Sequence, residues 1–117
     1  KNPKSVHIME IIKSEKFKGW YVGKFEPNLI KSDNYEFGFK RIVEGTKPDY
    51  HYHKVKTEYT ILIEGKILLE KSGQIILPIT TVKLEPFEKN DQYYLEDSII
   101  LIINTPSIKN DKYLKKE

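Results

Sequence analysis

Short apolar segments separated by turn residues run along most of the chain, and the clearest alternation lies in residues 35–43. One face of this predicted strand carries the aromatic side chains and the only arginine of the chain, namely Tyr35, Phe37, Phe39, Arg41 and Val43. A charged group on an aromatic face needs a partner, which is either an internal carboxylate or an anionic ligand. Arg41 is therefore the best candidate for an anchor that binds a phosphate or a carboxylate.

Similar segments predict about nine short strands in total. We expect them at residues 6–12, 19–26, 35–43, 51–56, 58–64, 66–70, 74–77, 79–84 and 98–104. Residues 98–104 are apolar on both faces, which predicts a central strand. The chain has no convincing amphipathic helix, so the pattern favours an all-β barrel or sandwich.

Composition narrows the class of protein further. The chain has 117 residues, of which 38% are hydrophobic and 12% aromatic, enough for the packed core of a single domain over residues 1–117. It has no cysteine, which excludes disulfides and thiolate metal sites and fits a cytoplasmic protein. No apolar run approaches the roughly 20 residues that span a bilayer, and the first residues lack the apolar core of a signal peptide.

The charge pattern gives no support for a nucleic-acid partner. The net charge of +3 comes from 20 basic and 17 acidic residues that are scattered along the chain. Only one of the basic residues is an arginine, whereas nucleic-acid binders usually cluster their basic residues and use arginine for phosphates and base edges.

Residues 45–65 contain the strongest candidate for a functional site. His51 and His53 are separated by one residue, so on a strand both imidazoles point to the same side. Glu58 follows after a short turn and begins the next apolar strand. Two histidines and a carboxylate form a ligand set suited to divalent iron, manganese and similar metals. The alternative is a surface hairpin whose histidines are solvated.

The spacing of this stretch resembles the first motif of the cupin superfamily. That motif is a glycine, five residues, H-x-H, three or four residues, a glutamate, six residues and a glycine, and its fixed positions are filled here by Gly45, His51, His53, Glu58 and Gly65. The resemblance covers about residues 35–106 and implies the double-stranded β-helix, or jelly roll, of the cupins. Residues 107–117 would then leave the barrel as an exposed extension.

The second cupin motif is weakly kept. In the best register only Pro86 is retained, and Asp91 stands where the motif has its histidine. The resemblance therefore implies Asp91 as a fourth metal ligand. Two alternatives stay open: Asp91 is a loop residue and water completes the site, or a slip of one residue presents Gln92 instead. In the same register Tyr93 would point into the cavity and donate a proton or a hydrogen bond to a ligand.

The resemblance implies a metal-dependent enzyme that acts on a small anionic substrate such as a sugar phosphate or an organic acid. Isomerase, dioxygenase, decarboxylase and lyase reactions occur among such proteins, with a divalent Fe, Mn, Ni or Zn ion held by His51, His53, Glu58 and Asp91. Tyr93 and Arg41 are the candidate catalytic residues. The alternatives are a non-catalytic module that binds a small ligand and a metal-free barrel similar to the sugar-nucleotide epimerases. We also expect a homodimer, paired through edge strands or swapped N-terminal strands.

Overall fold

The computed structural model describes residues 9–114, which form nine strands and one short 3-10 helix. The elements are η1 (Ser14–Phe17), β1 (Trp20–Gly23), β2 (Ile30–Lys31), β3 (Glu36–Ile42), β4 (Thr57–Glu64), β5 (Ile67–Leu69), β6 (Gln74–Ile76), β7 (Thr80–Leu84), β8 (Gln92–Tyr94) and β9 (Ser98–Thr105). No helix in these residues is long and apolar enough to cross a membrane.

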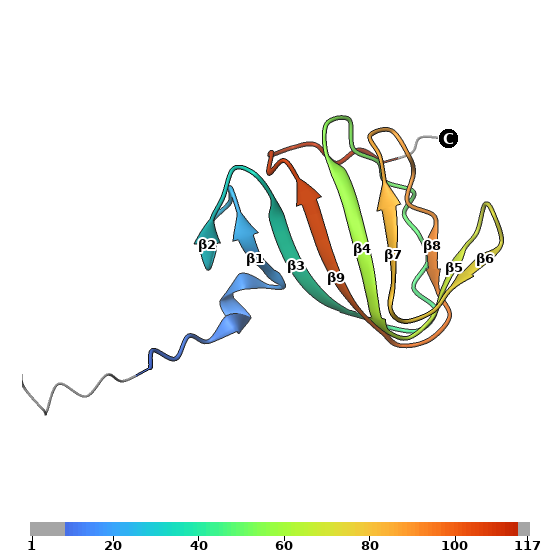
Figure 1. Ribbon diagram of the computed structural model, residues 1–117, viewed down its shortest axis with the longest axis horizontal. Coiled ribbons are helices and arrows are strands. Elements are labelled where there is room, and N and C mark those ends of the chain that lie inside the picture. Colours follow the sequence, from blue (N-terminus) through green and yellow to red (C-terminus); the bar gives the residue numbers. More distant parts are fainter. Residues whose placement is uncertain (1–8, 115–117) are drawn as a thin grey trace, which may run out of the picture.

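The strands form a large curved sheet and a small one (Figure 1). The large sheet has six strands in the order β2-β1-β3-β9-β4-β7, and the small sheet has three in the order β6-β5-β8. The strand β9 pairs antiparallel with both β3 and β4, which confirms that residues 98–104 form a central strand. The all-β prediction is confirmed.

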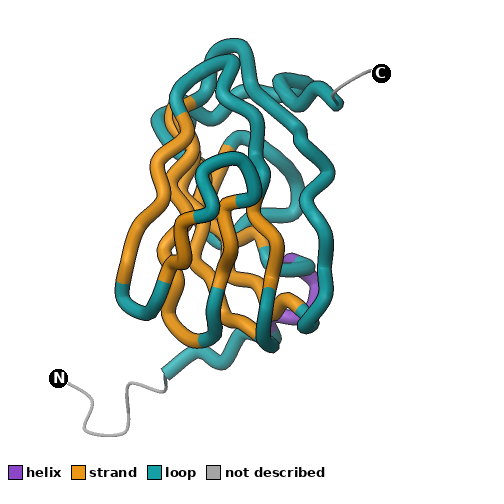
Figure 2. Tube along the Cα trace, turned by 90° about the vertical axis from the view of Figure 1, so that its right-hand side faces the viewer, coloured by secondary structure: helices purple, strands orange, loops and turns teal. Residues whose placement is uncertain are grey.

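The core lies between the two sheets. Its buried members are Leu62, Ile67, Ile76, Tyr94, Ile100 and Ile102. Leu62 of β4 and Ile67 of β5 are fully buried, and burying a side chain of this size contributes roughly 1.5–3 kcal/mol to folding. In the view turned by 90°, most strands lie on one side of the molecule and long loops lie on the other (Figure 2).

Several predicted strands differ from the observed ones. Residues 51–56 form an extended loop in which only Tyr52 makes a β-bridge, to Tyr113. Residues 9–12 form no strand, and the remainder of the predicted strand 6–12 lies outside the described residues. The short strands β2 and β8 were not expected from the sequence, because each has only two or three residues and too little alternation to stand out.

The strand at residues 35–43 has the opposite orientation to the one that its aromatic pattern suggested. The buried face of β3 carries Glu36 and Gly38, whereas Phe37 and Phe39 are only partly buried and Arg41 is exposed. The interior beside β3 is a cavity that holds charged and polar side chains as well as apolar ones, so the polar face of the strand can turn inward.

The C-terminal segment also differs from the exposed extension that was expected. Within residues 107–114, Ser107 and Asp111 are only 4% and 5% exposed. The segment returns along the loop that precedes β4, where Tyr113 pairs with Tyr52. Hydrogen bonds to that loop hold it in place, a type of long-range pairing that local sequence patterns do not reveal.

Candidate metal centre

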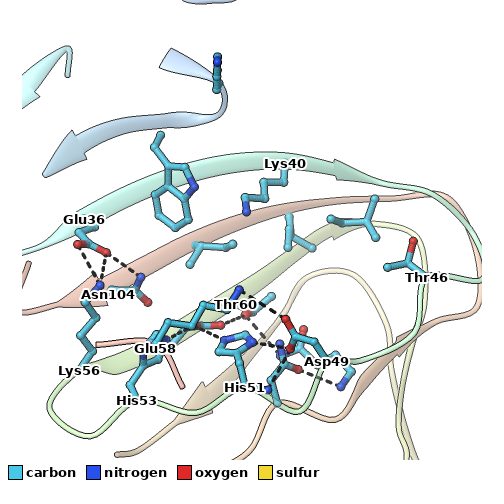
Figure 3. Close-up of a pocket in the computed structure, with 18 of the residues that line it drawn as sticks. Glu36, Lys40, Thr46, Asp49, His51, His53, Lys56, Glu58, Thr60 and Asn104 are labelled. Carbon is cyan, nitrogen blue, oxygen red and sulfur yellow. Dashed lines mark hydrogen bonds and ion pairs between the residues drawn. The ribbon is translucent and has the colours of Figure 1, made fainter. Parts of the chain in front are cut away.

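His51, His53 and Glu58 meet inside the barrel, at the edge of the cavity between the sheets (Figure 3). Glu58 lies on β4, and its neighbours on the same inward face are Thr60 and Leu62. The two histidines lie in the extended loop before β4, on either side of Tyr52, whose backbone pairs with Tyr113. Extended backbone turns residues two apart to the same side, so both imidazoles face inward.

The three side chains offer a compact set of donor atoms. The ligand atoms of His51, His53 and Glu58 all lie within 4.8 Å of one another. The Oε1 atom of Glu58 is 3.3 Å from Nε2 of His51 and 3.0 Å from Nε2 of His53. The three residues are 8%, 6% and 5% exposed, respectively. The expected 2-His-1-carboxylate arrangement is therefore present as a geometry.

The outer nitrogen of each histidine has a partner of its own. Nδ1 of His51 lies 2.7 Å from a carboxylate oxygen of Asp49, and Nδ1 of His53 lies 2.5 Å from the backbone carbonyl oxygen of Asp111. Carbonyl and carboxylate oxygens accept hydrogen bonds, so each Nδ1 carries the hydrogen. In the neutral ring Nε2 then presents its lone pair to the Glu58 carboxylate, an arrangement that needs a proton or a cation between them. Metal-binding histidines commonly have such outer partners, so these residues fit a divalent metal.

Charge coupling within this cluster shifts the pKa values of its members. Burial acts to raise the pKa of Glu58, but hydrogen bonds and charge from His51 and His53 outweigh it and lower the pKa to about 2. Burial acts to lower the pKa of His51, but its contacts with Glu58 and Asp49 raise it overall. Glu58 is therefore ionised at neutral pH, as a metal ligand must be.

A chain of hydrogen bonds reaches the second oxygen of Glu58. The Tyr94 hydroxyl donates to Oε1 of Gln92 over 3.1 Å, and Nε2 of Gln92 donates to Oγ1 of Thr60 over 3.4 Å. The Thr60 hydroxyl then donates to Oε2 of Glu58 over 3.5 Å. Burial raises the pKa of Tyr94 well above its usual range, so its hydroxyl keeps the proton that it donates. The chain holds Glu58 so that Oε1 faces the histidines.

The cavity beside the cluster has a volume of about 700 Å³ and is lined by residues of both sheets and of the loop before β4. Lys40 points into it from β3 (Figure 3), with its ammonium 5.0 Å from the centre of the Trp20 ring. Among the described residues Lys40 has no ion-pair partner. Burial and the charge of Lys112 lower its pKa, against the opposing charges of Glu58 and Asp49.

A second polar cluster lines another part of the cavity wall. Glu36 accepts hydrogen bonds from Nζ of Lys56 at 2.9 Å, from Nδ2 of Asn104 at 2.9 Å and from Oγ of Ser107 at 3.0 Å. Because the Glu36 carboxylate only accepts, the Asn104 amide must turn its NH₂ group toward it. Oδ1 of Asn104 is then the one buried side-chain polar atom, among the described residues, that has no partner.

This acceptor lies close to the histidine cluster in the sheet. In the antiparallel register Asn104 of β9 stands opposite Glu36 of β3 on one side and Glu58 of β4 on the other. The three residues form one row across the inner face of the sheet. Asn104 therefore separates the Glu36–Lys56 ion pair from the candidate metal ligand.

Asp91, the predicted fourth ligand, lies away from this cluster. Its carboxylate accepts a hydrogen bond from the backbone N–H of Lys71 over 2.8 Å, at the turn after β5. The group of potential ligands found in the described residues does not contain it. Gln92 takes the inward position, 2% exposed, which is the one-residue slip left open above.

The same slip displaces Tyr93. On β8, Tyr94 pairs with the fully buried Ile67 of β5, and cross-strand partners point to the same face. Tyr94 therefore lines the cavity and Tyr93, the candidate proton donor, points to the other face. The local pattern around residue 92 alternates weakly, so only pairing with β5 determines which tyrosine faces inward.

Arg41 does not reach the cavity either. It is exposed on the outer face of β3, where its guanidinium carbon lies 5.9 Å from the centre of the Phe39 ring. The neighbouring Lys40 lines the cavity in its place. Residues that sequence reasoning missed, such as Lys40 and Glu36, form the polar side of the same alternating strand.

The chain matches no known family profile, and no curated protein matches it either. Solved structures do resemble it. Ectoine synthase from P. lautus aligns over 92% of this chain and 91% of its own, with a TM-score of 0.63 and 14% identity. The DMSP lyase DddQ from Ruegeria pomeroyi aligns over 89% of this chain and 55% of its own, with a TM-score of 0.67 and 12% identity.

A third similar structure is a sugar phosphate isomerase of the cupin superfamily from Silicibacter pomeroyi. It aligns over 72% of this chain and 58% of its own, with a TM-score of 0.58 and 17% identity. Other neighbours are described as cupin and double-stranded β-helix proteins. These likenesses establish the fold.

Proposed function

We propose that this chain, which has the double-stranded β-helix fold of a small cupin, is a metal-dependent enzyme that acts on a small anionic substrate. The observation that carries the proposal is the meeting of His51, His53 and Glu58 within 4.8 Å, with an outer hydrogen-bond partner on each histidine. The three residues would hold a divalent metal, and water or substrate would complete its coordination.

The donor set indicates what the site can do. Two imidazole nitrogens and one carboxylate oxygen suit divalent Fe, Mn, Ni or Zn and leave coordination positions open. A metal held there supplies a Lewis acid that polarises a substrate oxygen or lowers the pKa of a bound water or hydroxyl. Of this chain's own residues, Glu58 stays ionised and Thr60 orients it.

The wall opposite the ligands favours an anion. Lys40 is a half-buried ammonium with no carboxylate partner among the described residues, and its burial is unfavourable unless an anion joins it. Lys40 would bind a phosphate or carboxylate of the substrate, the role that the sequence had suggested for Arg41. The indole of Trp20 flanks the ammonium and limits the directions that it can take.

The anion that Lys40 would bind indicates the class of substrate. Sugar phosphates and hydroxy acids carry such a group. A sugar phosphate isomerase and a lyase are among the proteins of similar fold.

A thermal-shift screen of sugar phosphates and hydroxy acids on the metal-loaded protein tests the substrate class. At least one anionic compound should raise the Tm of the wild type, and the same compound should have little effect on Lys40→Met. Lys47→Met, which removes an exposed lysine at the cavity rim, is the matched control and should respond like the wild type. Equal shifts in Lys40→Met and the wild type would rule out Lys40 as the anion anchor.

A non-catalytic module that binds the same kind of ligand is the second candidate. The observation that favours it is the position of Tyr93 and Arg41, which both point away from the cavity. The ionisable groups of the cavity wall that are not exposed are the three candidate ligands, the neutralised pair Glu36–Lys56, Lys40 and Tyr94. A ligand from the screen that is recovered unchanged after long incubation with the metal-loaded protein would support this candidate.

We also propose that the chain forms a homodimer through the outer face of the large sheet. Two apolar rows cross that face in register, Phe37–Ile103–Tyr59 and Phe39–Leu101–Ile61. At the ends of the β3 side of the face, Tyr35 and Val43 are 50% and 70% exposed. Packing two such faces together would bury these rows, since stacked sheets bring apolar faces into contact.

Light scattering on the purified protein measures this association. The wild type should have the mass of a dimer, and Leu101→Lys should have the mass of a monomer. Ile75→Lys changes an exposed apolar residue of β6 in the small sheet and should stay dimeric. A monomeric wild type at moderate concentration would contradict the dimer.

A further inference from the structure

The C-terminal residues 111–113 contact the outer shell of the candidate metal site. The backbone carbonyl oxygen of Asp111 accepts the hydrogen bond from Nδ1 of His53 at 2.5 Å, across 58 positions of sequence. Both residues are buried, at 5% and 6% exposed. The position of His53 therefore depends on a segment at the far end of the chain.

The side chain of Asp111 fixes that carbonyl in place. Its carboxylate oxygens accept hydrogen bonds from three successive backbone N–H groups, those of Lys54 at 3.0 Å, Val55 at 3.0 Å and Lys56 at 2.8 Å. Hydrogen bonds to an ionised acceptor are stronger than neutral ones. Asp111 thus binds the loop that follows His53 through its side chain and the His53 ring through its main chain.

Tyr113 binds Tyr52, the residue that precedes His53. The backbones of Tyr113 and Tyr52 exchange two hydrogen bonds, each 2.9 Å long, and their rings stack at 5.5 Å between centres. Tyr52 is the residue between the two histidines. Its pairing with Tyr113 keeps the H-x-H stretch extended, and this extended shape turns both imidazoles inward.

Lys112, in the same segment, contacts Asp49, which is the outer partner of His51. Nζ of Lys112 lies 3.5 Å from one oxygen of Asp49, whose other oxygen is the partner of Nδ1 of His51. Because Lys112 and Asp49 are largely exposed, this pair contributes little energy. Within residues 111–113, Asp111 and Tyr113 therefore contribute most of the contacts that hold the two histidines in place.

We infer that Asp111 is a positioning residue for the metal ligand His53, and that residues 111–113 set the metal affinity of this chain. The inference rests on the proposed function, because it assigns these residues to the same metal site. Asp111 holds His53 in the tautomer with its hydrogen on Nδ1 and its lone pair on Nε2. Loss of this contact frees the ring to rotate and to move its hydrogen to Nε2, and the lone pair then no longer faces Glu58.

The test compares Asp111→Ala with the wild type by titrating the metal-free proteins with Mn²⁺ or Zn²⁺ in a calorimeter. Removing an outer partner of a metal-binding histidine typically lowers affinity about 10- to 100-fold. Asp111→Ala keeps the backbone carbonyl but removes the carboxylate that fixes it, so we expect a loss near the lower end of that range, about 10-fold. Lys109→Ala changes an exposed residue of the same segment and is the matched control, with unchanged affinity. An affinity of Asp111→Ala equal to that of Lys109→Ala would overturn the inference.

A second measurement separates this inference from the proposed function. The ¹⁵N shifts of the His53 ring, read in metal-free protein at a pH where the ring is neutral, report which nitrogen carries the hydrogen. We expect Nδ1–H in the wild type and a mixture of both tautomers in Asp111→Ala. A wild type that binds no metal but shows this change would contradict the metal site alone, whereas an unchanged tautomer in the variant would contradict the positioning role alone.

Asp111→Asn covers the case in which Asp111→Ala does not fold. Asparagine keeps one acceptor oxygen for the N–H groups and leaves the backbone carbonyl in place, so it should preserve the fold and most of the affinity. If Asp111→Ala folds, we expect the metal affinity of Asp111→Asn to lie between those of Lys109→Ala and Asp111→Ala. If Asp111→Ala does not fold, we expect Asp111→Asn to bind the metal severalfold more weakly than Lys109→Ala does. Affinity equal to that of Lys109→Ala, together with wild-type ring shifts, would overturn the inference in that case.

Discussion

The Nε2 atom of His53 lies 3.0 Å from Oε1 of Glu58, and neither side chain is more than 7% exposed. The lone pair of such a nitrogen and a carboxylate repel each other unless a proton or a divalent cation lies between them. Metal binding and proton binding therefore compete at this site, and the competition has consequences that can be measured.

Metal affinity should increase with pH between about pH 6 and pH 8. The pKa of His51 is raised above its usual 6.5, because its contacts with Glu58 and Asp49 outweigh the effect of burial. The ring therefore holds its proton to a higher pH than a free histidine does, and this proton must leave before a metal binds. Calorimetric titration with Zn²⁺ at several pH values measures the effect. Affinity that is independent of pH over this range would show that His51 loses no proton on binding.

The stability of the metal-free protein should fall in acid in a way that depends on Glu58. Its folded-state pKa of about 2 lies below the unfolded value of 4.5, so its contribution is present above pH 4.5 and is lost as the pH falls toward 2. The shift corresponds to a contribution on the order of 3 kcal/mol. Urea unfolding of the wild type and of Glu58→Gln at pH 7 and at pH 3 provides the comparison.

The difference in unfolding free energy between the two proteins should shrink toward pH 3. Glu85→Gln is the matched control, because Glu85 is an exposed carboxylate whose loss should change stability little at either pH. A gap between wild type and Glu58→Gln that stays constant with pH would contradict the coupling of Glu58 to the histidines.

Gly65, the last position of the H-x-H motif, should not tolerate a side chain. Its φ angle is +109°, and a Cβ atom there would lie 2.1 Å from Oγ of Ser98 and 2.7 Å from its Cα. Gly65→Ala should therefore lower the free energy of unfolding by several kcal/mol, since both backbone strain and a steric clash oppose it. Gly73→Ala is the matched control: its φ is +75°, but its Cβ would meet open space, so we expect a loss of about 1–2 kcal/mol. Equal losses measured by urea unfolding would contradict the clash.

The sequence predicted those parts of the site that are local in the chain. His51, His53 and Glu58 lie within eight positions, and the two-residue spacing of the histidines was enough to turn both rings inward. The outer partners could not be predicted in the same way. The contact of His53 with Asp111 joins residues 58 positions apart, and only the folded chain brings them together.

The orientation of β3 shows a second limit of sequence patterns. Alternation correctly predicted a strand at residues 35–43, but it suggested an aromatic face turned inward. That expectation assumes a wholly apolar interior, and the cavity beside β3 also contains charged side chains. Lys40 and Glu36 therefore point inward, and Arg41 outward. In a barrel that encloses a ligand site, the polar face of a strand is a candidate for the inside.

Register accounts for the remaining error. Asp91 and Tyr93 were expected inside, and Gln92 and Tyr94 are found there instead. A shift of one residue exchanges the two faces of a strand, and here the pairing of β8 with β5 determines the register.

Metal content tests the central claim most directly. Elemental analysis of protein purified without a histidine tag, and of His51→Ala prepared in the same way, measures it. We predict close to one divalent Fe, Mn, Ni or Zn ion per chain in the wild type, and its loss in a His51→Ala protein that keeps its β-rich circular dichroism. A wild type that contains no metal, and that takes up none when metal is added, would contradict the account.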